Sequence, residues 1–143
     1  MVRKHRRTSH SKYELKAHLI WVTKYRYKVL VDDIKHRIRD LIRQSCVACD
    51  IHIISGHVSS DHVHLYISYP PHLSITEIVK SIKGRTSRRI QEEFPKLGKQ
   101  YWGRHFWSIG YAAFSSGDIT DEMIKDYIKN HQDKDFGDFT VEK

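Results

Sequence analysis

Residues 51–69 read IHIISGHVSSDHVHLYISY, two β-like runs joined by a polar triplet at 59–61. The second run alternates, and successive side chains of a strand point to opposite faces. His62 and His64 therefore share one face, and the apolar residues between and after them fill the other. The proline pair at 70–71 cannot continue a strand ladder and ends the run. The stretch predicts a β-hairpin that presents two imidazoles side by side.

The remaining periodicity places other elements around this hairpin. An alternating run at 13–23 favours a central strand. Helical spacing follows Asp32 or Asp33, either of which is a suitable N-cap. Ser74 and Glu77 have the spacing of a capping box that opens a second helix. We expect strands at 13–23, 51–58, 62–69 and 105–114, helices at 32–49 and from 74 to a loop at 95–104, and a last helix that starts between 118 and 121 and runs to about 132.

The order β-α-β-β-α-β with one terminal helix predicts an α+β, ferredoxin-like or RRM-like fold. Its antiparallel sheet carries helices on one face and leaves the other face free. The 143 residues suffice for one domain, which we place at 12–132, after a basic arm at 1–11 and before a tail at 133–143. Because nucleic-acid-binding modules also use this architecture, the fold does not choose between binding and cutting.

Composition limits the partners and the compartment. A net charge of +8 and a pI of about 9.5 favour a polyanionic partner such as nucleic acid, although a merely well-solvated basic protein stays open. The longest apolar run is too short for a membrane span, and the basic N-terminus does not lead into a signal-peptide segment, so we expect a cytoplasmic protein. Cys46 and Cys49 form a C-x-x-C without a second pair, and we expect them to be reduced and structural.

The last predicted helix carries two residues that suit chemistry. Tyr127 and His131 lie one turn apart on the stripe of Ile124 and Ile128. Both residues fit an ordinary core-facing surface. They equally fit a site, because a helix docked by its isoleucines would bring a phenol and an imidazole to the histidine pair. The H-x-H pattern by itself also suits either a packed pair or metal ligands, so the residues leave both interpretations open.

Three motifs occur together in this chain: Asp61-His62-Val63-His64, Lys83-Gly84-Arg85-Thr86-Ser87-Arg88 and Asp126-Tyr127-Ile128-Lys129. Their combination resembles the small HUH transposases with a single catalytic tyrosine, the TnpA-type proteins of the two-hundred/six-hundred-five group of insertion sequences. Further matches extend the likeness over about residues 13–132: His18-Leu19-Ile20-Trp21, Lys24-Tyr25-Arg26, Phe106-Trp107 and Gly110-Tyr111.

The resemblance implies site residues. His62 and His64 would be metal ligands, Tyr127 the nucleophile, and the position four residues after Tyr127 the third ligand. The family usually has Gln there, whereas this chain has His131 followed by Gln132. Helix geometry favours His131, because position i+4 lies on the face of Tyr127 and position i+5 is turned about 100° further. Three imidazoles would shift the preference toward Mn²⁺ or another transition metal relative to Mg²⁺.

The resemblance also implies an activity and partners. The activity is cleavage and rejoining of single-stranded DNA at insertion-sequence ends through a covalent 5′-phosphotyrosine, with subterminal DNA hairpins as the recognised partner and a divalent metal ion as cofactor. A homodimer in which the Tyr127 helix completes the partner's site is implied as well. The loop at 115–117 is short and could act as the hinge of that helix.

Basic residues supply candidates for DNA binding, although a solvated helix end remains the alternative for the largest group. The arm residues Arg3, Lys4, Arg6 and Arg7 could add a flexible grip on phosphates. A second function also stays open, a non-catalytic or domesticated protein that binds single-stranded or hairpin DNA on the same fold. The candidates for DNA contact are Lys80, Lys83, Arg85, Arg88 and Arg89 of the second helix, with Lys24 and Arg26 after the first strand.

Overall fold

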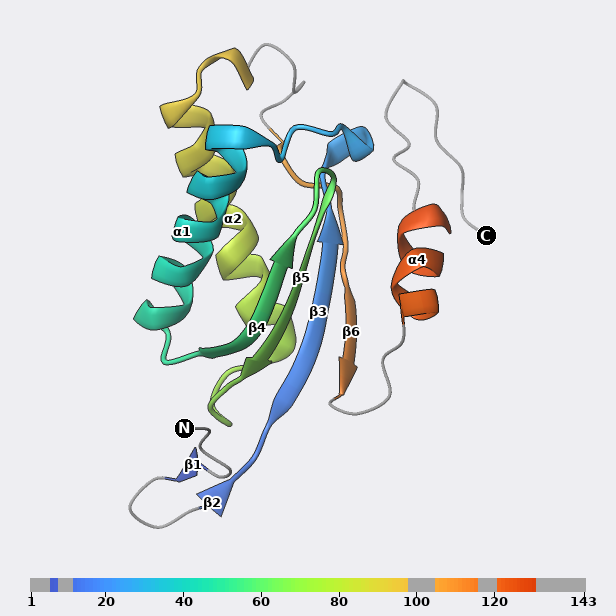
Figure 1. The fold of residues 1–143 in the computed structure, drawn as a ribbon. Coiled ribbons are helices and arrows are strands. Elements are labelled where there is room, and N and C mark those ends of the chain that lie inside the picture. Colours follow the sequence, from blue (N-terminus) through green and yellow to red (C-terminus); the bar gives the residue numbers. More distant parts are fainter. Residues whose placement is uncertain (1–5, 8–11, 98–104, 116–120, 131–143) are drawn as a thin grey trace.

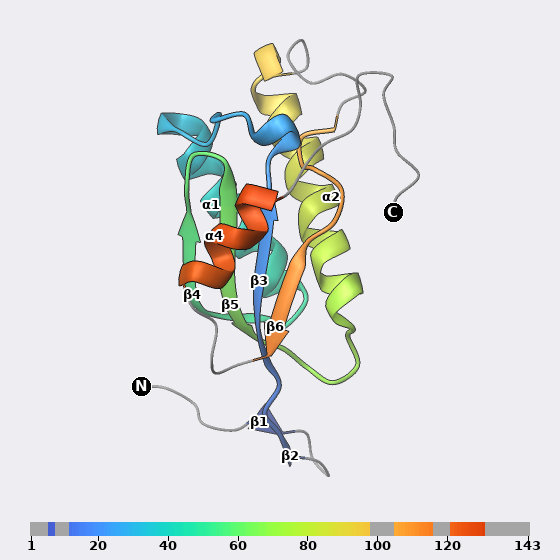
Figure 2. The same ribbon diagram turned by 90° about the vertical axis from the view of Figure 1, so that its right-hand side faces the viewer.

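The computed structural model describes residues 6–7, 12–97, 105–115 and 121–130, which form an α+β fold around a four-stranded antiparallel sheet. Helices α1 (Asp32–Ala48) and α2 (Ile75–Glu93) cover one face of the sheet, and α4 (Asp121–Asn130) lies over the other face (Figure 1; Figure 2). The ferredoxin-like prediction is confirmed, except that the face expected to be free carries α4. The strands, in spatial order, are β4 (His52–Val58), β5 (His62–Ser68), β3 (Lys16–Val22) and β6 (Ala112–Ser115).

Strand β5 lies between β4 and β3 and is antiparallel to both. It forms the predicted hairpin with β4, and it pairs with β3 from Lys16 opposite Ser68 to Val22 opposite His62. Residues that face each other in paired strands share a face of the sheet. Val63, Leu65 and Ile67 of β5 are 0–3% exposed, whereas His62, His64 and Tyr66, which point to the other face, are half-buried. The sheet therefore has an apolar face toward α1 and α2 and a histidine face toward α4.

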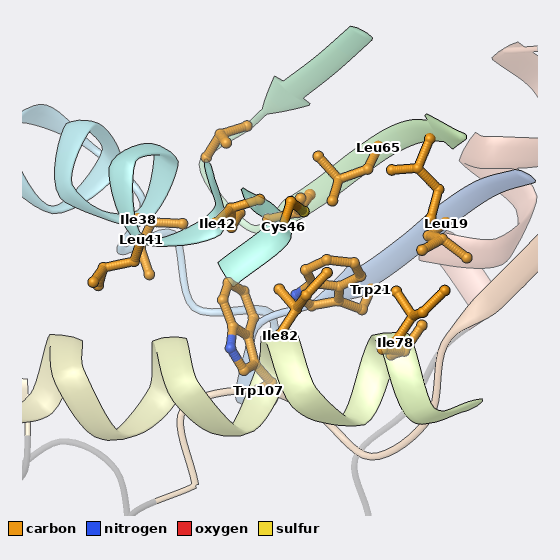
Figure 3. Close-up of a cluster of buried hydrophobic side chains, with 14 of the residues drawn as sticks. Leu19, Trp21, Ile38, Leu41, Ile42, Cys46, Leu65, Ile78, Ile82 and Trp107 are labelled. Atoms are coloured by element: carbon orange, nitrogen blue, oxygen red, sulfur yellow. The ribbon is translucent and has the colours of Figure 1, made fainter. Parts of the chain in front are cut away.

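The main core lies between the sheet and the two long helices (Figure 3). Trp21 of β3 and Trp107 meet edge to face, with ring centroids 5.9 Å apart and planes at 89°. Phe106 is fully buried beside Trp107. These three aromatic side chains are core residues. Around them gather Leu19, Leu65, Ile38, Leu41, Ile42, Cys46, Ile78 and Ile82.

The helix starts differ in how well the sequence predicts them. The capping box of α2 is confirmed, since the Glu77 backbone N–H donates to Ser74 Oγ at 3.0 Å and the Ser74 N–H donates to Glu77 Oε1 at 2.9 Å. The predicted cap of α1 is wrong: the N-cap is Val31, without a side-chain bond. Asp32 and Asp33 lie instead in the first turn, where negative charge favours the positive end of the helix dipole.

The strand predicted at 105–114 is shorter than expected. Only Ala112–Ser115 forms β6, and Trp107 makes one isolated bridge to Thr23. The backbone of residues 106–108 bonds to the end of β3 and the turn after it, and Gly110 has a φ of 92°, which interrupts an extended strand. The segment is therefore a structured connection that packs Phe106 and Trp107 into the core.

The predicted terminal regions are described only in part. Arg6–Arg7 (β1) pair antiparallel with Lys12–Tyr13 (β2). Arg3 and Lys4, the hinge residues after 115, His131, Gln132 and the tail at 133–143 lie outside the described residues. Within the described ranges, no helix has both the length and the apolar character needed to cross a membrane.

Candidate functional site

The two histidines of β5 face α4 across a hollow of about 320 Å³. Strand alternation places both imidazoles on this face, and the facing residue of β4 adds His57, which is exposed. Ile124, Lys125 and Ile128 of α4 close the other side of the hollow. We call this space the histidine hollow; its lining residues are His57, Ser59, His62, His64, Ile124, Lys125 and Ile128.

His62 is oriented by the acid that precedes it. Its Nδ1 lies 2.9 Å from Asp61 Oδ1, and Asp61 is only 8% exposed. The β4–β5 turn is closed by a backbone bond from Ser59 N–H to the His62 carbonyl, so the Asp61 carboxylate is not needed as a turn cap. A carboxylate on one ring nitrogen is the arrangement that fixes a metal-binding histidine and directs its other nitrogen to the ion. The geometry therefore supports an orienting role for Asp61.

His64 lies within hydrogen-bond distance of His18, a contact that the sequence analysis did not predict. His18 Nδ1 of β3 lies 3.0 Å from His64 Nε2, and the His18 ring stacks on Tyr66, with centroids 4.1 Å apart and planes at 7°. Burial lowers the pKa of His18 from its ordinary value of 6.5, which favours a neutral ring near pH 7. The stretch that contains His18 belongs to the resemblance, but nothing in its local pattern places His18 beside His64.

Tyr127 lies on the docked helix but lines a different space. It borders a hollow of about 470 Å³ together with Phe114, Met123, Asp126 and Asn130, and its hydroxyl oxygen is shielded from solvent. Within one chain, the isoleucines of α4 therefore lie against the histidine hollow and Tyr127 lies beside β6. His131 is outside the described residues, and among those described no three His, Cys, Asp or Glu side chains are arranged to hold a metal ion.

The basic cluster of α2 divides into an outer and an inner part. Lys80, Arg85, Arg88 and Arg89 are exposed, as phosphate contacts require. Lys83 turns inward, where its Nζ donates to the carbonyls of Ser108 and Gly110, each at 2.8 Å.

The inner part of the cluster also includes Thr86. Its Oγ1 accepts the Trp107 Nε1–H at 2.9 Å and donates to the Ile82 carbonyl at 2.8 Å. Lys83, one of the predicted DNA-binding residues, and Thr86, its neighbour in the stretch that resembles the transposase family, therefore hold the segment 105–111 onto α2. Contact of Lys83 with phosphate stays a prediction.

Lys24 and Arg26 form the one-turn helix η1 (Lys24–Arg26) beside the histidine face. Lys24 is 7% exposed, with Nζ 5.4 Å from the centroid of the Tyr25 ring. Arg26 Nε lies 3.7 Å from Asp61 Oδ2, on the carboxylate that holds His62. Tyr25 and Arg26 have φ values of 58° and 55°, a conformation that non-glycine residues adopt at a cost. The turn therefore extends the histidine site, and its contact with DNA stays a prediction.

The C-x-x-C pair belongs to the core and not to this site. Both thiols are free, and burial raises the pKa of Cys46 to about 12. Such a thiol is almost entirely protonated at neutral pH and is a poor nucleophile. This agrees with the structural role expected for the pair.

Comparison with known proteins matches nearly the same residues as the resemblance seen in the sequence, which covers about residues 13–132. The family described as "Transposase IS200 like" matches residues 11–131. The ISDra2 transposase TnpA of Deinococcus radiodurans is 34% identical over 123 residues, which cover 86% of this chain and 88% of that protein. The transposase for insertion sequence element IS200 of Salmonella typhimurium is 28% identical over 127 residues, which cover 89% of this chain and 83% of that protein.

Two solved structures of transposases have a similar fold. A crystal structure from Deinococcus radiodurans R1, described as that of a transposase, aligns with a TM-score of 0.81 at 33% identity and covers 87% of this chain and 96% of that one. A REP-associated tyrosine transposase bound to a REP hairpin aligns with a TM-score of 0.55 at 13% identity over 86% of this chain and 67% of that one. At that identity, the second likeness concerns the fold alone.

The bond between Trp107 and Thr86 yields a prediction about stability. In a Thr86→Val variant the shape of the side chain is kept, but the buried indole N–H loses its acceptor, which costs about 1–3 kcal/mol. We expect the free energy of unfolding to fall by this amount in urea titrations followed by tryptophan fluorescence. Thr76→Val is the matched control, because exposed Thr76 shares its bond with the Tyr111 hydroxyl at the surface, where water replaces it. Equal stability of the two variants would contradict the assignment.

Proposed function

The chain belongs to the IS200-like transposase family, and from this premise we propose that it cleaves and rejoins single-stranded DNA at the ends of an insertion sequence. The family resemblance expected from the sequence is confirmed, and with it the general function of a transposase. One observation carries the proposal furthest: α4, the helix that bears Tyr127, lies on the same face of the sheet as His62 and His64 (Figure 2).

Tyr127 is the proposed nucleophile. Its phenolic oxygen forms a bond to the phosphorus of a phosphodiester while the bond from phosphorus to the 3′ oxygen breaks. The phenolic proton passes to solvent, the 3′ oxygen takes up a proton from solvent and leaves as a hydroxyl, and the 5′ phosphate stays on the tyrosine. A free phenol has a pKa of about 10 and is a weak nucleophile, so the site has to favour its ionisation. The phosphotyrosine ester conserves the bond energy for rejoining without a nucleotide cofactor.

The histidine face fits a divalent metal ion as far as the described residues extend. His62 is already oriented through its Nδ1 by Asp61, which directs its Nε2 lone pair outward. We propose His62 and His64 as ligands of Mg²⁺ or Mn²⁺, with His131 as the third. When bound, such an ion polarises the phosphate and offsets the charge that develops on its oxygens.

The position of α4 bears on how the site is completed. Ile124 and Ile128 border the histidine hollow, whereas Tyr127 lines the neighbouring hollow beside Phe114. Within one chain Tyr127 is thus separated from the histidine pair. We propose that the protein is a homodimer in which α4 of one protomer supplies Tyr127 to the histidine pair of the other. The separation of Tyr127 from His62 and His64 also favours the second candidate function, a non-catalytic protein that binds hairpin DNA. Such a protein does not need the tyrosine beside the histidines.

The partner we propose is single-stranded DNA with hairpins near the element ends. The charge of +8 favours DNA, and the exposed side chains Lys80, Arg85, Arg88 and Arg89 put cations along one helix. A hairpin is bound in the structure of the distant fold relative, and we extend that kind of partner to this chain. Phosphate contacts position the DNA, whereas the hairpin sequence is selected by contacts to base edges or by DNA shape.

The first prediction concerns the covalent intermediate. With a hairpin-bearing oligonucleotide and MnCl₂, the protein should form an adduct that survives denaturing electrophoresis, and chelation by EDTA should abolish it. Tyr127→Phe should remove the adduct while hairpin binding persists. Tyr111→Phe is the matched control, because that hydroxyl bonds Thr76 at the surface and should be dispensable. If the wild type and Tyr127→Phe behave alike, the binding protein is the correct alternative.

The second prediction concerns assembly in trans. Chains carrying Tyr127→Phe and chains carrying His64→Ala should each be inactive alone. When they are unfolded together and refolded, random pairing leaves one intact site in half of the dimers, so about a quarter of the wild-type cleavage should return. The measurement is adduct yield per chain. No recovery, despite heterodimers detected by differential tagging, would count against a shared site.

The third prediction concerns the basic helix. A variant with Arg85→Gln and Arg88→Gln should bind a hairpin oligonucleotide more weakly, and the slope of log affinity against log salt should become shallower by about 1.5–2. Arg43→Gln removes one charge from an exposed position on α1 and is the control. Fluorescence anisotropy in EDTA measures both. An unchanged slope would mean that the basic cluster of α2 is a solvated helix surface that does not contact DNA phosphates.

A further inference from the structure

We propose that His18 is a positioning residue for the metal site, the partner that orients His64 as Asp61 orients His62. The inference rests on the proposed function, because it concerns the ion that His62 and His64 would hold. Each histidine of the H-x-H pair has one ring nitrogen within hydrogen-bond distance of a neighbouring side chain: Asp61 for His62, and His18 for His64.

The geometry of His18 is set by the sheet. His18 of β3 faces Tyr66 of β5 in the antiparallel register, and His64 faces Ile20, so His18 and His64 are diagonal neighbours on one face. Their ring nitrogens, His18 Nδ1 and His64 Nε2, are 3.0 Å apart. Near-parallel stacking on Tyr66, at 7°, restrains the plane of the His18 ring. A stiff pair of strands and a stacked phenol ring therefore present Nδ1 to His64.

Imidazole chemistry gives this contact a consequence. In a neutral imidazole one nitrogen carries the proton and the other carries the lone pair, so a bond between two ring nitrogens needs one of each. We assign the proton to His64 Nε2 and the accepting lone pair to His18 Nδ1. The lone pair of His64 then resides on Nδ1, in the form that a metal ion requires.

The pairing of His62 with Asp61 follows the same rule, but here Nδ1 of the ligand histidine carries the proton, whereas in His64 it is Nε2. His62 donates its Nδ1–H to Asp61 Oδ1, so its lone pair resides on Nε2. The two imidazoles would thus enter the metal site through different ring nitrogens, each fixed before the ion arrives. Preorientation of this kind lowers the entropy lost on metal binding, and removing such a partner commonly weakens metal affinity about 10–100-fold.

Two substitutions of His18 separate the hydrogen bond from the packing. His18→Phe keeps an aromatic ring against Tyr66 but has no acceptor. His18→Asn loses the ring but offers an amide oxygen close to the position of Nδ1. His52→Phe is the matched control, because His52 is an exposed imidazole at the far end of the edge strand β4. Thermal unfolding and hairpin binding in EDTA establish that each variant is folded.

The experiment measures Mn²⁺ affinity of the full chain without DNA, from the electron paramagnetic resonance signal of free Mn²⁺. We expect His18→Phe to weaken binding about 10–100-fold, and His18→Asn and His52→Phe to stay within about threefold of the wild type. His62→Ala is included to show that the measured binding belongs to this site.

Several outcomes would overturn the inference. If His62→Ala weakens Mn²⁺ binding and His18→Phe does not, His18 has no positioning role, while the metal site of the proposed function stands. If His18→Phe binds Mn²⁺ more tightly, the proton lies on His18 and this residue competes with the ion. If the wild type binds no Mn²⁺, the proposed metal site fails, and the inference fails with it.

Discussion

The register of β5 against β3 and β4 is the constraint on which the site depends. Side chains alternate with a period of two along β5, so a slip by one residue would turn His62 and His64 into the core and expose Val63, Leu65 and Ile67. Burial of those three side chains contributes about 5–9 kcal/mol. That is comparable with the whole stability of a typical domain, about 5–15 kcal/mol. The hydrophobic core therefore determines which way the imidazoles point.

The end of β3 connects this sheet to the residues that surround the site. Thr23 N–H bonds the Asp61 carbonyl, and Lys24 N–H bonds the carbonyl of Phe106, both at 2.9 Å. One short turn thereby holds the acid that orients His62 and also the segment that carries Trp107. Lys83 and Thr86 fasten the same segment to α2. In the stretch 83–88, which resembles the transposase family, Lys83 and Thr86 thus have a structural role, and the exposed side chains of Arg85 and Arg88 remain accessible to a partner.

Helix α4 is the element whose position matters most for function. It docks through Ile128, which is 9% exposed, and through Ile124 at the rim of the histidine hollow. Ordinary apolar packing explains this placement, and the same packing leaves Tyr127 beside Phe114. Tyr127 precedes Ile128 by one position and is turned about 100° from it around the helix, so the two side chains border different hollows although they lie on one side of α4. Completion of the site therefore calls for a second copy of the helix, as proposed, or for a different docking of this one.

The sequence by itself determined the elements whose signals are local. Alternation defined the β4–β5 hairpin and the shared face of His62 and His64, and Ser74 with Glu77 defined the start of α2. Local patterns were insufficient at α1, where Val31 precedes the two acids, and at residues 105–111, which bond to β3 instead of forming a strand. Only the tertiary structure decided that His18 meets His64 across 46 positions of the chain and that Ile124 and Ile128, not Tyr127, border the histidine hollow. These contacts depend on strand register and helix docking, which arise from the packing of the whole core and leave no periodic trace in any one segment.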